Sequence, residues 1–269
     1  MREMETERTY SILIWPCLAQ LIALAMVAAT RPRPEVELTA AQAGGLSAFY
    51  VLLLFATASL MLYLIKTGRI RILKALLLLS LFYAASLSLA EVLASLSLPW
   101  ALSVPLGAAF TWLGLRPGLV GNASKALLSS AVAYLFVSTF PEVFTFVFLG
   151  SLAVYDAYAI FRGPLGKMFS SAGATHGGDL REDPLKPMLV THGRVSMGLG
   201  DLFAYSLASA SSTRMFGLVG ALFPLLLLNA GVVLTLHLLY SRRRVLPGLT
   251  LPVALWLLGV AALSVTPPV

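Results

Sequence analysis

Apolar segments of about 20 residues recur along almost the whole chain. That is the length an α-helix needs to cross the hydrocarbon core of a bilayer. Within a bilayer every backbone polar group must be bonded inside the protein, so contiguous spans of this length form helices. The pattern predicts an all-α, polytopic membrane protein with about nine transmembrane helices, approximately Ser11–Ala29, Leu46–Ile65, Ile72–Ser95, Trp100–Leu115, Ala123–Phe140, Glu142–Phe161, Val195–Ser212, Met215–Tyr240 and Leu249–Val265.

Composition supports this prediction and excludes two other classes of protein. Hydrophobic residues make up 58% of the 269 residues and charged residues 12%. These fractions exclude a soluble domain and a disordered chain. The first apolar segment lacks a small-residue cleavage site and is followed by many more spans, so we expect a retained helix and not a signal peptide. A single cysteine, Cys17, excludes an intramolecular disulfide and a cysteine-based metal site.

The polar segments divide one integral membrane domain into three parts. Residues 1–161 are expected to form an amino-terminal bundle of six spans. Residues 162–194 contain Gly, Ser, Pro and most of the mid-chain charges, a composition typical of a connecting loop. Residues 195–269 are expected to form a carboxy-terminal part of three spans.

The positions of lysine and arginine predict the orientation of these spans. With the amino terminus in the cytoplasm, 16 of the 19 Lys and Arg residues fall on the cytoplasmic side, and Arg31, Arg33 and Arg214 fall outside. This distribution follows the positive-inside rule and places the carboxy terminus outside the cytoplasm. The net charge of +7 is therefore a topology signal. We expect membrane lipids, and no nucleic acid, as partners of the basic segments.

Two aspartates stand alone in apolar segments, which marks a candidate functional site. Asp156 lies six residues before Arg162, and Asp201 lies seven residues after Arg194. At about 1.5 Å per residue, both carboxyls are expected roughly 10 Å inside the cytoplasmic edge. The two helices are expected to run antiparallel and to pack with these carboxyls facing each other, with Gly198 and Gly200 allowing a close approach.

A pair of carboxyls in one low-dielectric site cannot readily hold two charges, so the pair shares one proton. It then offers one base and one acid. The base can activate a water molecule against a peptide carbonyl while the acid protonates the carbonyl oxygen. Asp156 and Asp201 are therefore the candidate catalytic residues.

Around these residues the sequence resembles the presenilin and signal peptide peptidase family of GxGD intramembrane aspartyl proteases. Tyr155-Asp156 is similar to the family's YD motif in the sixth span, and Gly198-Leu199-Gly200-Asp201 to its GxGD motif in the seventh. Pro247-Gly248-Leu249 falls at the family's Pro-Ala-Leu element before the ninth span, with Gly248 in place of alanine. The resemblance implies a substrate-binding set of Tyr155, Gly198, Leu199, Gly200, Pro247, Gly248 and Leu249.

The same resemblance implies an activity. It is hydrolysis of peptide bonds within transmembrane helices of other proteins, without a metal or an organic cofactor. A chain of this size, with a short loop after the sixth span, is most similar to a microbial, archaeal presenilin homologue. Family members whose amino terminus is cytoplasmic favour substrate helices whose amino terminus lies outside. The resemblance therefore implies the same preference for this chain.

The proline element also has a physical interpretation. Pro247 has no backbone N–H, and Gly248 leaves the backbone open, so we expect a non-helical entry to the last span. Irregular backbone at membrane depth is tolerated where it lines a cavity, and this segment could therefore form a wall of the site. A plain turn before the last helix is the alternative.

Two other functions fit the paired aspartates. A proton- or cation-coupled secondary transporter would use them as an ion site, and inverted repeats with broken helices would support it. A prepilin-peptidase-like enzyme also carries a GxGD motif but in another topology. No HExxH pattern is present, which argues against a metalloprotease, and Gly45-Leu46-Ser47-Ala48 lacks the GxSG pattern of a rhomboid-like serine protease.

Overall fold

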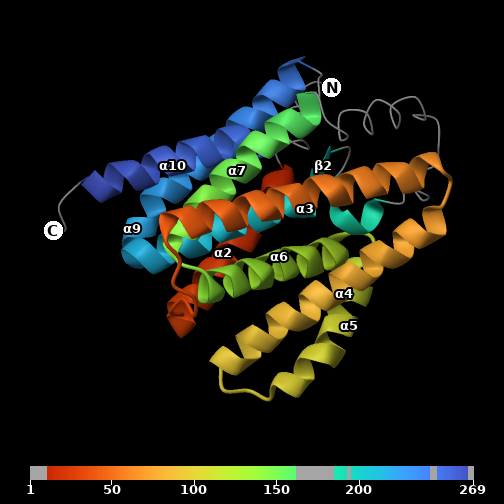
Figure 1. The fold of residues 1–269 in the computed structure, drawn as a ribbon, viewed down its shortest axis with the longest axis horizontal. Coiled ribbons are helices and arrows are strands. Elements are labelled where there is room, and N and C mark those ends of the chain that lie inside the picture. The colour runs from red at the N-terminus through yellow and green to blue at the C-terminus, as the bar shows by residue number, and fades with distance from the viewer. Residues whose placement is uncertain (1–10, 162–184, 193–194, 243–246, 266–269) are drawn as a thin grey trace.

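A computed structural model describes residues 11–161, 185–192, 195–242 and 247–265 of the chain (Figure 1). Its described part is helical apart from one short antiparallel hairpin. The elements are a 3-10 turn (Ser11–Leu13), α2 (Ile14–Thr30), α3 (Ala40–Lys66), α4 (Ile70–Ser95), a 3-10 turn (Trp100–Leu102), α5 (Ser103–Gly114), α6 (Leu119–Thr139), α7 (Glu142–Phe161), a 3-10 turn (Lys186–Met188), β1 (Leu189–His192), β2 (Val195–Gly198), α9 (Leu199–Arg242) and α10 (Thr250–Val265).

The helices have the length and apolarity of membrane spans. Six of the described helices are long and apolar enough to cross a membrane, and two shorter apolar helices cover Trp100–Gly114 and Thr250–Val265. The 44 residues of α9 contain one non-helical residue, Gly217, with φ 69° and ψ −176°. Only glycine adopts this conformation readily, so the helix is broken there. Counting α9 as two helices gives nine in the described residues, which agrees with the prediction of about nine spans in a multi-pass membrane protein.

The first half of α9 runs parallel to α10. The Tyr205 hydroxyl donates to the carbonyl of Gly248, 2.8 Å away, just before α10 begins. Further along both helices, the indole N–H of Trp256 donates to Ser212 Oγ at 2.8 Å. Because the two contacts ascend together in sequence, both segments point the same way.

The second half of α9 runs antiparallel to α10. A Cβ atom placed on Gly231 would lie 2.5 Å from Pro252 Cα, and one placed on Gly259 would lie 2.9 Å from Pro224 Cα. The later residue of α9, Gly231, contacts the earlier residue of α10, and the earlier residue of α9, Pro224, contacts the later one. The second half of α9 is therefore antiparallel to α10, and the chain reverses its direction at Gly217. The two glycines permit the close backbone approach by which helices associate in a membrane.

The helices form one bundle with a lateral hairpin. The central helices are α2, α6 and α9, and α10 and α7 cover one side of them (Figure 1). Helix α3 packs against α7, while α4 and α5 pack together against α6 at the lower edge of Figure 1. The largest hydrophobic cluster therefore lies among α2, α6, α7, α9 and α10.

Polar side chains bond the central helices to one another. Gln20 on α2 and Asn229 on α9 exchange two amide hydrogen bonds of 3.0 and 2.9 Å. Ser209 Oγ donates to the Gln20 carbonyl at 3.0 Å, and Ser130 Oγ on α6 donates to the Ala19 carbonyl at 2.7 Å. Such interhelical bonds supply association energy where the hydrophobic effect between spans is weak.

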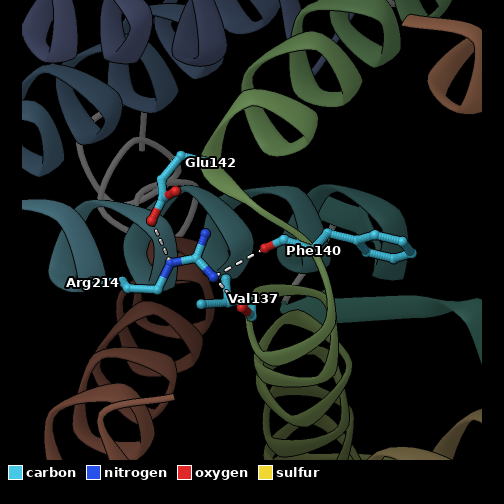
Figure 2. A network of polar contacts seen from close by, with 4 residues as sticks. All are labelled: Val137, Phe140, Glu142 and Arg214. Atoms are coloured by element: carbon cyan, nitrogen blue, oxygen red, sulfur yellow. Dashed lines mark hydrogen bonds and ion pairs between the residues drawn. The ribbon is translucent and has the colours of Figure 1, made fainter. Parts of the chain in front are cut away.

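At the end of the bundle opposite Tyr205 and Gly248, an ion pair joins α9 to α7. Arg214 Nε lies 2.8 Å from Glu142 Oε1, at the start of α7. The same guanidinium donates to the carbonyls of Val137 and Phe140, where α6 ends and the chain turns into α7 (Figure 2). The Arg214 side chain is only 7% exposed. One side chain thus joins α9 to the α6–α7 turn.

Several boundaries differ from the sequence prediction. Helix α3 begins at Ala40 and not at Leu46, and α6 begins at Leu119 and not at Ala123. Val195–Gly198 was expected to be helical but forms β2, so the helix begins at Leu199. The break between the next two spans lies at Gly217, and not at 213–214. The predicted loop 162–194 contains a 3-10 turn and β1, while its residues 162–184 and 193–194 lie outside the described part of the chain.

Candidate functional site

Asp156 lies in the last two turns of α7 and binds the start of α10. Its Oδ2 accepts a hydrogen bond of 2.9 Å from the backbone N–H of Leu249. Leu249 directly precedes α10, and the first N–H groups of a helix have no partner within the helix. One turn earlier on α7, the Ala153 carbonyl accepts a 3.1 Å bond from Thr250 Oγ1. Two bonds therefore hold this part of α7 against the entry to α10.

Asp201 lies in the first turn of α9, directly after the hairpin. A Cβ atom placed on Gly248 would lie 3.1 Å from both Asp201 carboxyl oxygens. One placed on Gly198 would lie 3.4 Å from Oδ2. The carboxyl is thus seated against the backbone of Gly248, which has no side chain to displace it. The absence of a side chain at residue 248 is what leaves room for it.

The segment Gly248-Leu249 therefore brings the two carboxyls together. Asp156 reaches it from α7 and Asp201 from α9, through adjacent residues of one non-helical segment. Tyr205, one turn after Asp201, holds the same segment by its bond to the Gly248 carbonyl and is itself 1% exposed. The entry to the last helix is non-helical, as predicted, and it lies beside both carboxyls.

The other predicted site residues have different surroundings. Tyr155 and Leu199 are half-buried and pack against the main hydrophobic cluster, and Leu249 is buried. Among the described residues, Tyr155, Leu199 and Pro247 form no bond to either carboxyl. The expected close approach of two spans at Gly200 is wrong, because a Cβ atom there would meet nothing within 4 Å. The close approaches lie instead at Gly231 and Gly259, between the second half of α9 and α10.

The charge setting suits acid–base chemistry. Neither Asp156 nor Asp201 has a cationic partner within the part of the chain that the structure describes. The same residues contain no cluster of three or more His, Cys, Asp or Glu side chains that could hold a metal ion. Two carboxyls that share one site and have no cationic partner can act as a base and an acid toward a bound water molecule.

Sequence reasoning missed three features of this site. Tyr205 was recognisable by its i+4 spacing from Asp201, which puts both on one helix face. The hairpin was recognisable from two four-residue segments separated by Gly193-Arg194, a spacing typical of a hairpin. The third feature is the bonding of Asn122 and Lys125 on α6 to β1, which joins residues 69 and 64 positions apart and leaves no local signal.

Comparison with known proteins identifies the fold. No family model matches the chain, and no curated protein matches it. Solved structures do match, and two of them are each of a presenilin family intramembrane aspartate protease. The first, in a C222 crystal form, has a TM-score of 0.66 and 20% identity, over 96% of this chain and 99% of its own. The second, in a P2 form, has a TM-score of 0.59 and 21% identity, over 93% of this chain and 96% of its own. The chain therefore has the fold of these proteins over nearly its whole length.

Proposed function

We propose that the protein is an intramembrane aspartyl protease that hydrolyses peptide bonds within transmembrane helices of other membrane proteins. The observation that carries the proposal is the meeting of the Asp156 and Asp201 carboxyls at Gly248-Leu249. The fold shared with two intramembrane aspartate proteases supports it. Asp156 and Asp201 are the catalytic residues in this proposal.

The reaction needs only the two carboxyls and one water molecule. The ionised carboxylate takes a proton from water, which attacks the scissile carbonyl carbon, while the protonated carboxyl gives its proton to the carbonyl oxygen. The resulting tetrahedral gem-diol has no net charge. The newly protonated carboxyl then gives its proton to the amide nitrogen. As the C–N bond breaks, the other carboxylate takes a proton from a gem-diol hydroxyl, so a carboxylic acid and an amine leave and the pair again holds one proton. No metal or organic cofactor takes part.

A substrate helix must unwind before its backbone can reach the carboxyls. The hairpin beside Asp201 offers a place for the unwound segment, because β1 covers one edge of β2 and the described residues contain no third strand. An extended peptide can add to such an edge through main-chain hydrogen bonds. Strand addition at β2 would carry the scissile bond toward Asp201, three residues beyond Gly198.

The orientation belongs to this proposal. Arg31 and Arg33 follow α2 in a loop that bonds to the end of α6, through Glu35 N–H to Ser138 O and Val36 N–H to Thr139 O. Arg214 binds at the same end. The three cations expected outside thus lie at the end opposite the aspartates. We place the aspartate end at the cytoplasm and expect substrate helices to have their amino terminus outside.

The test is incubation of the purified protein with a labelled transmembrane peptide, followed by mass spectrometry of the fragments. We expect cleavage within the apolar segment, unaffected by a metal chelator. A proton-flux assay on the same protein in vesicles addresses the transporter alternative, which the shared fold disfavours. Proton transport without cleavage would contradict the proposal, and so would activity that a chelator removes and zinc restores.

A further inference from the structure

The hairpin fixes the position of Asp201. Strands β1 and β2 pair in the register Leu189↔Gly198 and Thr191↔Ser196, and β2 runs directly into α9. Asp201 therefore follows the last paired residue by three positions. A shift of the hairpin would therefore move the Asp201 carboxyl and the outward edge of β2 together.

Two buried side chains near the start of α6 bind the outer edge of β1. The Asn122 amide donates to the Thr191 carbonyl at 2.8 Å and accepts from the Thr191 N–H at 3.4 Å. Lys125 Nζ donates to the Leu189 carbonyl at 2.6 Å. Asn122 and Lys125 are 4% and 5% exposed. A lysine is rarely so buried unless it is paired, which makes this contact a specific one.

These bonds determine which backbone groups remain open. In an antiparallel pair, residues alternate between bonding across the ladder and pointing their N–H and C=O groups outward. The bonds to α6 show that Leu189 and Thr191 point outward from β1. Their register partners, Gly198 and Ser196, must then point outward from β2. The outward groups of Thr191 and the carbonyl of Leu189 are occupied. On β2 the Gly198 N–H bonds to the Asp201 carboxyl, whereas no strand in the described residues covers Ser196 or the Gly198 carbonyl.

We propose that Asn122 and Lys125 are positioning residues that close the outer edge of β1 and hold the hairpin, so that a substrate strand adds to β2 beside Asp201. The substrate part of this inference rests on the proposed protease function. A strand edge with unbonded N–H and C=O groups can pair with any extended peptide. With the edge of β1 covered by side chains, pairing is confined to the strand that leads to the carboxyl.

The chain offers a matched control on the same turn of α6. Ser124 is buried like its two neighbours, but its hydroxyl donates to the Phe110 carbonyl of α5 at 2.7 Å. Ser124→Ala thus removes a buried hydrogen bond of α6 without touching the hairpin. Asn122→Leu and Lys125→Met remove the bonds to β1 while keeping similar side-chain volume.

The first measurement is amide hydrogen exchange of Leu189–His192 in the full-length protein in detergent. We expect exchange about tenfold faster in Asn122→Leu and in Lys125→Met than in the unmodified protein, and unchanged exchange in Ser124→Ala. Should either variant fail to fold, Asn122→Ala carries the test, because it removes both bonds to Thr191 without adding a charge or a bulky side chain. Exchange equal to that of the unmodified protein in the folded variants would overturn the inference.

The second measurement is the set of bonds cleaved in a transmembrane peptide. We expect Asn122→Leu and Lys125→Met to spread cleavage to bonds two residues from the main one, because side chains alternate with a period of two in a strand. Ser124→Ala should keep the original set. Faster exchange with an unchanged set would overturn the role in substrate placement. If the unmodified protein cleaves no peptide, the proposed function fails, and hydrogen exchange still decides whether α6 holds the hairpin.

Discussion

Gly248 is the residue on which both carboxyls of the site depend. Its carbonyl accepts from Tyr205, its Cα faces Asp201, and the next N–H in the chain donates to Asp156. Gly248 is not among the residues with positive φ. An alanine would therefore fit its backbone conformation, and the cost of one would come from the contact of the added Cβ with Asp201.

Gly248→Ala tests this contact. The Cβ would lie 3.1 Å from both carboxyl oxygens, so the carboxyl must move by a few tenths of an ångström. We expect kcat to fall about three- to tenfold, since small misplacements of reacting groups are costly. Stability should be unchanged or slightly higher, because alanine restricts the unfolded chain. Gly150→Ala, where a Cβ meets open space, is the control. Full activity of Gly248→Ala would show that a side chain at residue 248 does not displace the Asp201 carboxyl from its active position.

The pH dependence of cleavage tests whether the carboxyls act as a pair. At low pH both would be protonated and no base would remain, whereas at high pH both would be ionised and no acid would remain. We therefore expect a bell-shaped profile whose two limbs belong to the pair and not to either residue. The profile is measured on one transmembrane peptide, with folding monitored at each pH. A single-limbed profile over the range in which the protein stays folded would speak against a shared proton.

Sequence reasoning predicted that both aspartates and the proline element share one site, but not the hydrogen bonds that connect them. An isolated carboxyl in an apolar segment is detectable because its burial is costly. The bonds from Asp156 to Leu249 and from Tyr205 to Gly248 join residues 93 and 43 positions apart. Such contacts depend on tertiary packing, which a motif does not encode.

At the scale of elements, the long helices were predicted and the hairpin was missed, although its spacing was present in the sequence. Bounds such as Ile72–Ser95 against α4 (Ile70–Ser95), and Glu142–Phe161 against α7, differ by two residues or fewer, because hydropathy sets span length. Val195–Gly198 was assigned to a helix since its apolar residues continue into α9. Short apolar segments do not distinguish a strand from a helix by periodicity, and pairing with β1 decided the outcome.

The ion pair between Arg214 and Glu142 joins α9 to α7 at the end away from the site. Arg214→Met should lower the free energy of unfolding by about 2–3 kcal/mol, because it leaves a partly buried carboxylate and two carbonyls without their donor. Glu142→Gln should cost about 1 kcal/mol. The double variant should show coupling of about 1–2 kcal/mol.

Denaturant unfolding in detergent measures these values. Arg71→Met, an exposed arginine on α4, is the control and should stay within about 0.5 kcal/mol of the unmodified protein. Additive effects of Arg214→Met and Glu142→Gln would show that the ion pair contributes no coupling between α9 and the start of α7.

At the scale of the whole molecule, the charged residues discussed above lie at the two ends of the helical bundle. The loop after α2 and the ion pair of Arg214 lie at one end. The opposite end holds the hairpin, the aspartates and the entry to α10. Packing and the positive-inside pattern are independent observations, and both divide the molecule in the same way.

A topology reporter checks which end faces the cytoplasm. A reporter that is active only outside the cytoplasm, fused after Val269, should be active, because the predicted nine spans from a predicted cytoplasmic amino terminus end outside. The same reporter inserted within residues 162–194 should be inactive. The reverse pattern would show that the aspartate end faces outside. The expected preference would then change to substrate helices whose amino terminus lies in the cytoplasm.

The central claim is that Asp156 and Asp201 together hydrolyse a peptide bond within a membrane-spanning helix. The most direct measurement compares cleavage of one labelled transmembrane peptide by the unmodified protein, Asp156→Asn, Asp201→Asn and Glu91→Gln, which removes a carboxylate from α4. We expect each asparagine variant to fold and to lose at least about 1,000-fold in turnover, while Glu91→Gln keeps its activity. Near-normal turnover in either asparagine variant would contradict the assignment of a catalytic pair.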